Sequence, residues 1–186
     1  GVVFVHGLFS SPATWDSFTS LIAQDPDLAH TEVLHFGYAS PVAFWNPLRR
    51  IPSFDDVADN LRHFLDIEGE GHDRLILVSH SQGGLVVQRY LARMLGEGRG
   101  ENLARIRGII MFACPNSGSE LGLTFRKLFF RHPQERQLRP INEAVMEAQR
   151  AVLRGIVNAE SVSATSCPIP LTAYAGETDN IVTPTS

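Results

Sequence analysis

The sequence is poor in cysteine, has no basic excess and has no long apolar run, and each shortage excludes a class of protein. The 186 residues include two cysteines, Cys114 and Cys167, and no Cys-x-x-Cys pair, so neither a disulfide framework nor a zinc site is expected, although two cysteines allow a single bridge. A net charge of -4 argues against a nucleic-acid-binding protein, which would show a basic face. No apolar stretch approaches the roughly 18 residues that a membrane-spanning helix needs.

Signatures of bound cofactors are also missing. The sequence holds no phosphate-binding loop, no dinucleotide fingerprint and no metal-ligand spacing, so we expect no cofactor. The carboxylates Asp55, Asp56 and Asp59 favour a helix N-terminus over a metal site. With 44% hydrophobic and 19% charged residues, the chain has the composition of an ordinary globular protein, and its length predicts one domain, 1–186.

Short apolar runs alternate with amphipathic segments along the chain. The runs expected to form strands are 2–7, 31–38, 74–81, 106–115 and 171–176, and the segments expected to form helices between them include 11–24, 53–65 and 84–95. The strand runs are continuously apolar, which is typical of strands covered by helices on both faces. The alternation predicts an α/β fold with a doubly wound, mostly parallel sheet.

Residues 116–167 interrupt this alternation. They contain no clear strand and two amphipathic segments, 120–132 and 141–157, so we expect a helical cap over the carboxyl ends of the strands, where open α/β sheets bind ligands. The first segment is locally basic at Arg126, Lys127 and Arg131, with the apolar residues Leu128, Phe129 and Phe130 between them. This pattern fits either contact with an anionic lipid surface or a cap helix packed on the core with a solvated face, and the second interpretation is favoured.

Both ends of the sequence lie inside expected secondary-structure elements. Gly1 opens directly on a strand with no initiator Met, and Thr183-Pro184 near the other end is typical of a helix start. We therefore expect the chain to be a piece of a longer protein.

The junction at 79–83 carries the strongest chemical signal. Ser79-His80-Ser81-Gln82-Gly83 matches the Gly-x-Ser-x-Gly pattern, with serine in place of the first glycine, and it lies between an apolar strand and a helix. That pattern makes a sharp turn that exposes its central serine as a nucleophile. We predict Ser81 as the nucleophile, although a plain polar turn would have the same composition.

A nucleophilic serine needs N–H donors for the oxyanion that forms during acyl transfer. One donor should be the N–H of Gln82, the residue after the nucleophile, and the other should come from the loop after an earlier strand. His6 and Gly7 end the first strand, so we predict the N–H of Leu8 as the second donor, with Phe9 as the alternative. Gly7 allows close approach of the backbone, and His6 is expected to brace the loop by hydrogen bonds.

A carboxylate follows the last predicted strand, where the chain order Ser…Asp…His places the acid of a triad. Asp179 is the predicted acid, which would orient a histidine and stabilise the imidazolium. Glu177 is the nearby competitor, and a surface turn with no catalytic role is the alternative.

Five blocks of the sequence together resemble the α/β-hydrolases, and within them a serine-esterase subgroup of GPI inositol-deacylase-like and lipase-like proteins. The blocks are VVFVHGL, VLHFGYAS, LILVSHSQGGLVV, IRGIIMFACPNSGSELG and AGETDNIVTP. The resemblance implies Ser81 as nucleophile, Leu8 and Gln82 as oxyanion donors, and Asp179 as acid. It implies a catalytic histidine after one more strand, beyond residue 186, while Asn116 stands where the family often has histidine. None of the seven histidines in the chain follows Asp179, and His132 in the expected cap is the remaining candidate for a substitute base.

These observations predict a serine hydrolase that cleaves carboxylic esters, with a small-molecule or lipid ester as its partner. Two alternatives stay open: an acyltransferase on the same fold, and a non-catalytic recognition module of a larger protein.

Overall fold

The structure, a computed structural model, describes residues 1–7, 10–38, 54–114 and 135–174. Five strands form one sheet: β1 (Val2–Val5), β2 (Val33–Phe36), β3 (Leu75–His80), β4 (Ile106–Phe112) and β5 (Leu171–Tyr174). The strand order is β2-β1-β3-β4-β5, and every neighbouring pair is parallel. The predicted fold class is confirmed, and each predicted strand run contains one of these strands.

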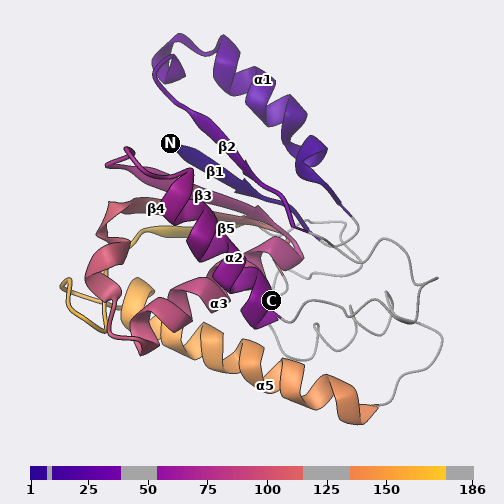
Figure 1. Ribbon diagram of the computed structural model, residues 1–186, viewed down its shortest axis with the longest axis vertical. Coiled ribbons are helices and arrows are strands. Elements are labelled where there is room, and N and C mark those ends of the chain that lie inside the picture. The colour runs from indigo at the N-terminus through magenta and orange to yellow at the C-terminus, as the bar shows by residue number, and fades with distance from the viewer. Residues whose placement is uncertain (8–9, 39–53, 115–134, 175–186) are drawn as a thin grey trace.

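Helices cover both faces of the sheet (Figure 1). Helix α1 (Asp16–Gln24) lies on one face, and α2 (Phe54–Ile67), α3 (Gln82–Gly96) and α5 (Glu135–Val152) lie on the other. Four short helical turns complete the described chain: η1 (Pro12–Trp15), η2 (Pro26–Leu28), η3 (Gly100–Arg105) and the π-helical turn η4 (Leu153–Val157).

The continuous apolar character of the strands follows from this two-sided cover. In β1, Val3 and Val5 belong to the large core cluster under α2 and α3, whereas Phe4 belongs to a second cluster on the α1 side. Phe4 stacks on Trp15 there, with ring centroids 4.6 Å apart. Because both faces of the strand are buried, neither can carry the alternating polar residues of a one-sided sheet.

Helix α5 packs along α3 and contributes to the main core. Val145, Ala148 and Val152 on α5 are buried, and Val145 and Val152 join the core cluster with Ile156 of η4. Residues 135–157 of the predicted cap segment therefore form part of the helical layer on this face of the sheet. The earlier predicted helix, 120–132, lies outside the described residues, and the cap itself stays a prediction.

Charged residues tie the three helices of this layer together. On α3, Arg89 lies 2.7 Å from Asp55 of α2 and 3.7 Å from Glu147 of α5, and Arg93 lies 2.9 Å from Asp59 of α2. The carboxylates near the start of α2 thus bind arginines, and the described part of the chain contains no group of side chains suited to hold a metal ion. No helix in that part is long and apolar enough to cross a membrane.

Candidate active site

The strand order brings the ends of β1 and β3 together. The two strands are parallel neighbours, with Val5 paired to Ser79, so the residues that follow them emerge side by side at the carboxyl edge of the sheet. A Cβ atom placed on Gly7 would lie 3.0 Å from Cβ of Ser81. The structure therefore places the predicted His6-Gly7 and Ser81 segments next to each other, although about 75 residues of sequence separate them.

Ser81 occupies a strained turn between β3 and α3. Its backbone angles are φ 52° and ψ -124°, in a region that non-glycine residues avoid. The N–H of Ser81 donates to the carbonyl of Phe112 on β4 at 2.8 Å, and the carbonyl of Ser81 accepts from the N–H of Gly84 at 3.0 Å. Such strain costs about 1–3 kcal/mol and persists where the surrounding contacts over-determine it.

The residues flanking Ser81 explain the composition of the turn. A Cβ atom on Gly83 would lie 2.5 Å from the carbonyl oxygens of both Val5 and His6, so only glycine lets α3 start this close to β1. Ser79 is fully buried, and its hydroxyl donates to the carbonyl of Ile110 at 3.3 Å. Serine in place of the first glycine of the pattern is thus accommodated, because it is small and its hydroxyl has an acceptor.

Gln82 begins α3 directly after Ser81. The first N–H groups of a helix have no acceptor within the helix and carry the positive end of its dipole. The N–H of Gln82 is therefore available to bind a negatively charged oxygen beside Ser81.

His80 is the last residue of β3, and its imidazole lies on the same side of the sheet as Trp15 of η1. Its ring meets Trp15 edge-on with centroids 6.5 Å apart, and a Cβ atom on Gly7 would lie 3.2 Å from Nδ1 of His80. His80 thus packs between β1 and η1.

His6 is locked by three hydrogen bonds and a ring stack. Its Nδ1–H donates to the carbonyl of Gly7 at 2.9 Å, and its Nε2 accepts from the N–H of Tyr38 at 3.3 Å. The Tyr38 hydroxyl donates to the carbonyl of His6 at 2.8 Å. The two bonds of the imidazole require a neutral ring with its proton on Nδ1, and burial lowers the pKa of His6, which favours the same neutral form.

Tyr38 was not predicted as part of the site. It lies just after β2, the other neighbour of β1, and burial raises the pKa of its phenol. An aromatic residue at the end of a predicted strand was the one available signal, but only the order of the strands shows that it meets His6.

Several predicted site residues lie outside the described residues: Leu8, Phe9, Asn116, His132, Glu177 and Asp179. Within the described residues, no side chain is hydrogen-bonded to the Ser81 hydroxyl. The roles of Leu8 as second oxyanion donor, of Asp179 as acid and of His132 as substitute base therefore stay predictions.

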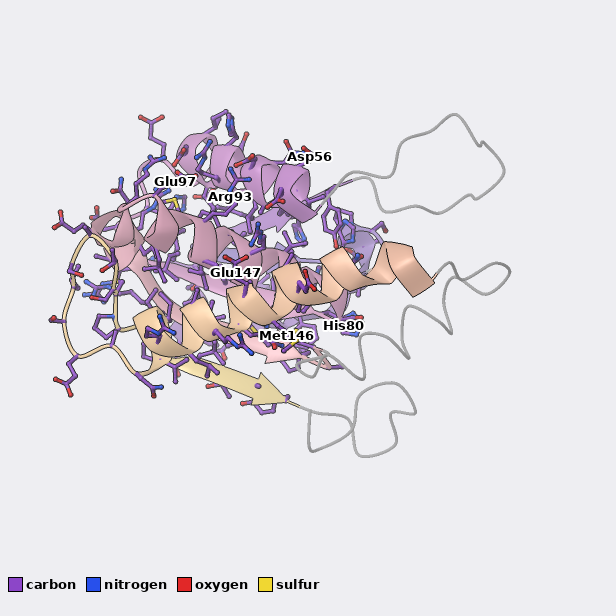
Figure 2. All side chains as sticks on the ribbon, turned by 90° about the horizontal axis from the view of Figure 1, so that it is seen from below. Asp56, His80, Arg93, Glu97, Met146 and Glu147 are labelled. Carbon is purple, nitrogen blue, oxygen red and sulfur yellow. The ribbon has the colours of Figure 1, made fainter. Side chains whose placement is uncertain are left out.

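A groove elsewhere on the molecule offers no comparable chemistry. It has a volume of about 720 Å³ and lies between the last turns of α3 and α5, away from Ser81. Figure 2 shows Arg93 on α3, Glu97 directly after α3 and Glu147 on α5, all of which line this groove. The charges face one another: Arg93 lies 3.7 Å from Glu97, and Glu147 lies 3.7 Å from Arg89. The groove thus holds paired surface charges and no nucleophile set beside a base.

The sequence matches the model of the alpha/beta hydrolase family over residues 2–179. No curated protein matches it.

Solved structures share the fold. A monoacylglycerol lipase of Paleococcus ferrophilus superimposes with a TM-score of 0.57 at 15% identity, covering 99% of this chain and 76% of its own. ClbQ from the colibactin NRPS/PKS pathway gives 0.54 at 13% identity, covering 99% and 78%. A Burkholderia cenocepacia protein assigned as an aryl esterase gives 0.52 at 20% identity, covering 98% and 73%.

Proposed function

This chain belongs to the alpha/beta hydrolase family, and on that premise we propose that it is a serine esterase that cleaves carboxylic esters through an acyl-enzyme on Ser81. The observation that carries the proposal is the left-handed backbone of Ser81 at the junction of β3 and α3, beside the end of β1. Strain of this kind is retained at positions where a side chain must be presented in one direction.

The proposed reaction begins with attack of the Ser81 Oγ on the ester carbonyl, while a histidine removes the hydroxyl proton. The oxyanion of the tetrahedral intermediate accepts hydrogen bonds from the N–H groups of Gln82 and Leu8. Collapse of the intermediate breaks the C–O bond, and the protonated histidine donates its proton to the departing alcohol. Water then attacks the acyl-enzyme in the same way and releases the acid. Asp179 orients this histidine and stabilises the imidazolium that forms.

His6 supports this reaction by fixing the peptide unit between Gly7 and Leu8. In a trans peptide unit the N–H points opposite to the carbonyl. The Nδ1–H of His6 donates to the Gly7 carbonyl at 2.9 Å and so restricts rotation of the peptide unit that follows Gly7. Removal of a single oxyanion donor costs about 10²–10³-fold in kcat in well-studied enzymes, so loss of this restriction is expected to lower kcat.

The proposed substrates are esters of small molecules, with a lipid-like acyl group as the finer proposal. The solved structures with this fold include proteins named as a monoacylglycerol lipase and an aryl esterase. A panel of p-nitrophenyl esters from acetate to palmitate tests the finer proposal. A preference for chains of eight or more carbons supports it, and a preference for acetate contradicts it.

The test of the function uses a fluorophosphonate probe, which reacts with activated serines, on the protein in its full natural length. We expect labelling that is abolished by Ser81→Ala and retained in Ser17→Ala, a control on the exposed side of α1. Hydrolysis of p-nitrophenyl acetate should be lost in parallel. A folded protein that neither labels nor hydrolyses any ester would contradict the proposal and favour the recognition module.

A further inference from the structure

Two neighbouring strands end in the same unusual way. Ser81 after β3 has φ 52°, and Ala113 after β4 has φ 48°; within the described ranges they are the two non-glycine residues with positive φ. The two turns are joined, because the N–H of Ser81 donates to the carbonyl of Phe112 at 2.8 Å. The N–H of Ala113 is itself bound, donating to the carbonyl of Tyr174 on β5 at 2.7 Å. The predicted chemistry accounts for the strain at Ser81 and leaves the strain at Ala113 unexplained.

The turn at Ala113 is followed by Cys114, whose side chain lies against the first turn of α3. Cys114 is 4% exposed, and a Cβ atom on Gly84 would lie 2.5 Å from its Sγ atom. Gln88 follows Gly84 by one helical turn and therefore lies on the same face of α3. Its Nε2–H group points at Sγ of Cys114 and at Sδ of Met111, each 3.6 Å away. The thiol thus occupies a notch on α3 formed by Gly84 and Gln88.

Simple packing does not account for this notch. Gln88 is 4% exposed, and burying a side-chain amide is unfavourable unless it is hydrogen-bonded. An apolar residue at position 88 would fill the same space without that cost. Nor is Cys114 suited to react: burial raises the pKa of its thiol to about 12, so it stays protonated at neutral pH.

The contacts close a ring around the nucleophile. Ser81 is bonded to Phe112, the chain continues through Ala113 to Cys114, Cys114 contacts Gly84, and the N–H of Gly84 donates to the carbonyl of Ser81 at 3.0 Å. A shift of Cys114 out of the notch would therefore move the first turn of α3. That turn carries both the Ser81 side chain and the N–H of Gln82.

We propose that Gln88 and Cys114 are positioning residues that hold the Ser81 turn in its reactive geometry. The inference rests on the proposed function of Ser81. Neither residue touches the substrate, so loosening the notch should lower kcat and leave KM unchanged. Misplacement of a reacting group by about 1 Å can cost on the order of 10²-fold in rate.

The test compares four variants in the full natural chain: Cys114→Ala, Cys114→Ser, Gln88→Met and Cys167→Ala. Cys114→Ala empties the notch, whereas Cys114→Ser supplies an oxygen that accepts from the Gln88 amide. Gln88→Met keeps the volume and removes the donor. Cys167→Ala is the matched control, because Cys167 is also buried (2% exposed) but lies just before β5, away from the start of α3.

We expect Cys114→Ala and Gln88→Met to lower kcat and the fluorophosphonate labelling rate about 10- to 100-fold with KM within twofold of the wild type. Cys114→Ser should recover most of the rate, and Cys167→Ala should lose stability without losing kcat. Equal kcat in Cys114→Ala and Cys167→Ala, or an equal loss in Cys114→Ser and Cys114→Ala, would overturn the inference. Ser81→Ala separates the two proposals. If Ser81→Ala keeps full activity, the proposed function is wrong. If Ser81→Ala is inactive and Gln88→Met has the kcat of the wild type, only the positioning role is wrong.

Discussion

The rings of His6 and Tyr38 stack with centroids 4.3 Å apart and planes 7° from parallel, at the point where β1 and β2 end. The stack is closed at both edges by hydrogen bonds, one from the Tyr38 N–H to the imidazole and one from the Tyr38 hydroxyl to the His6 carbonyl. Tyr38 therefore fixes the ring that, in our account, directs the peptide unit after Gly7.

Tyr38→Phe should weaken this arrangement without removing the stack. The carbonyl of His6 loses the donor that now lies 2.8 Å away, and loss of a partner by a buried group costs about 1–3 kcal/mol. We expect a drop of that size in the free energy of unfolding, measured in urea, and a several-fold lower kcat. Tyr174→Phe is the control, since Tyr174 is 54% exposed. Equal effects of the two substitutions would contradict the account.

Protonation of His6 should contribute to the pH dependence of the free energy of unfolding. Burial lowers the pKa of His6 in the folded protein below the ordinary value of 6.5. At pH values between the folded and the unfolded pKa, the unfolded chain therefore binds a proton at His6 that the folded chain does not. Stability is therefore unaffected by His6 above pH 6.5 and falls as the pH is lowered through that window, by at most about 1.4 kcal/mol per pH unit.

His6→Asn is the variant that tests this dependence. The Asn amide can still donate to the Gly7 carbonyl but does not titrate, so the slope of unfolding free energy against pH should be shallower than in the wild type. The same substitution at the exposed His30 is the control. A wild-type slope that His6→Asn leaves unchanged would show that His6 does not titrate as described.

Gly83→Ala and Gly96→Ala form a matched pair on α3. A Cβ atom at position 83 would lie 2.5 Å from two backbone oxygens of β1, whereas at position 96 it would meet nothing within 4 Å. The first substitution should destabilise the protein by about 1–3 kcal/mol and abolish labelling of Ser81. The second should be neutral, or stabilising by up to about 1 kcal/mol. Thermal unfolding and probe labelling of the two variants test this prediction, and equal stability and labelling of both would contradict it.

Both thiols should be inert in the folded protein. Burial raises the pKa of Cys114 to about 12 and also raises that of Cys167, and both side chains are shielded from solvent. Iodoacetamide should modify neither residue in the native protein and both after unfolding in guanidinium, as counted by intact mass. Rapid native alkylation of Cys114 would show that the notch on α3 opens readily.

The strands and the strand-to-helix turn at Ser81 could be predicted from the sequence because both depend on local patterns. Continuous apolar runs indicate strands covered on both faces, and the Ser79–Gly83 pattern lies at one strand-to-helix junction. The apolar face of 141–157 was visible too, but such a face does not say what covers it. Only the structure shows that α5 packs on α3.

The supporting contacts could not be predicted because they join elements that lie far apart in the sequence. Tyr38 lies 32 residues from His6, and Gln88 lies 26 residues from Cys114. One local indication of Gln88 was visible in the sequence: its amide directly follows the apolar residues Leu85, Val86 and Val87. A polar side chain buried in a helix face requires a partner, but the partner is set by strand order and register.

The central claim, an acyl-enzyme on Ser81, is tested most directly by locating the acyl group. The protein is mixed with p-nitrophenyl butyrate, quenched in acid within the first turnover and digested with trypsin, which releases the peptide 75–89. We predict a butyryl group on this peptide, assigned to Ser81 rather than Ser79 by fragmentation and absent from Ser81→Ala. Steady hydrolysis of the ester by Ser81→Ala at the wild-type rate, or an acyl group on any other residue, would contradict the account.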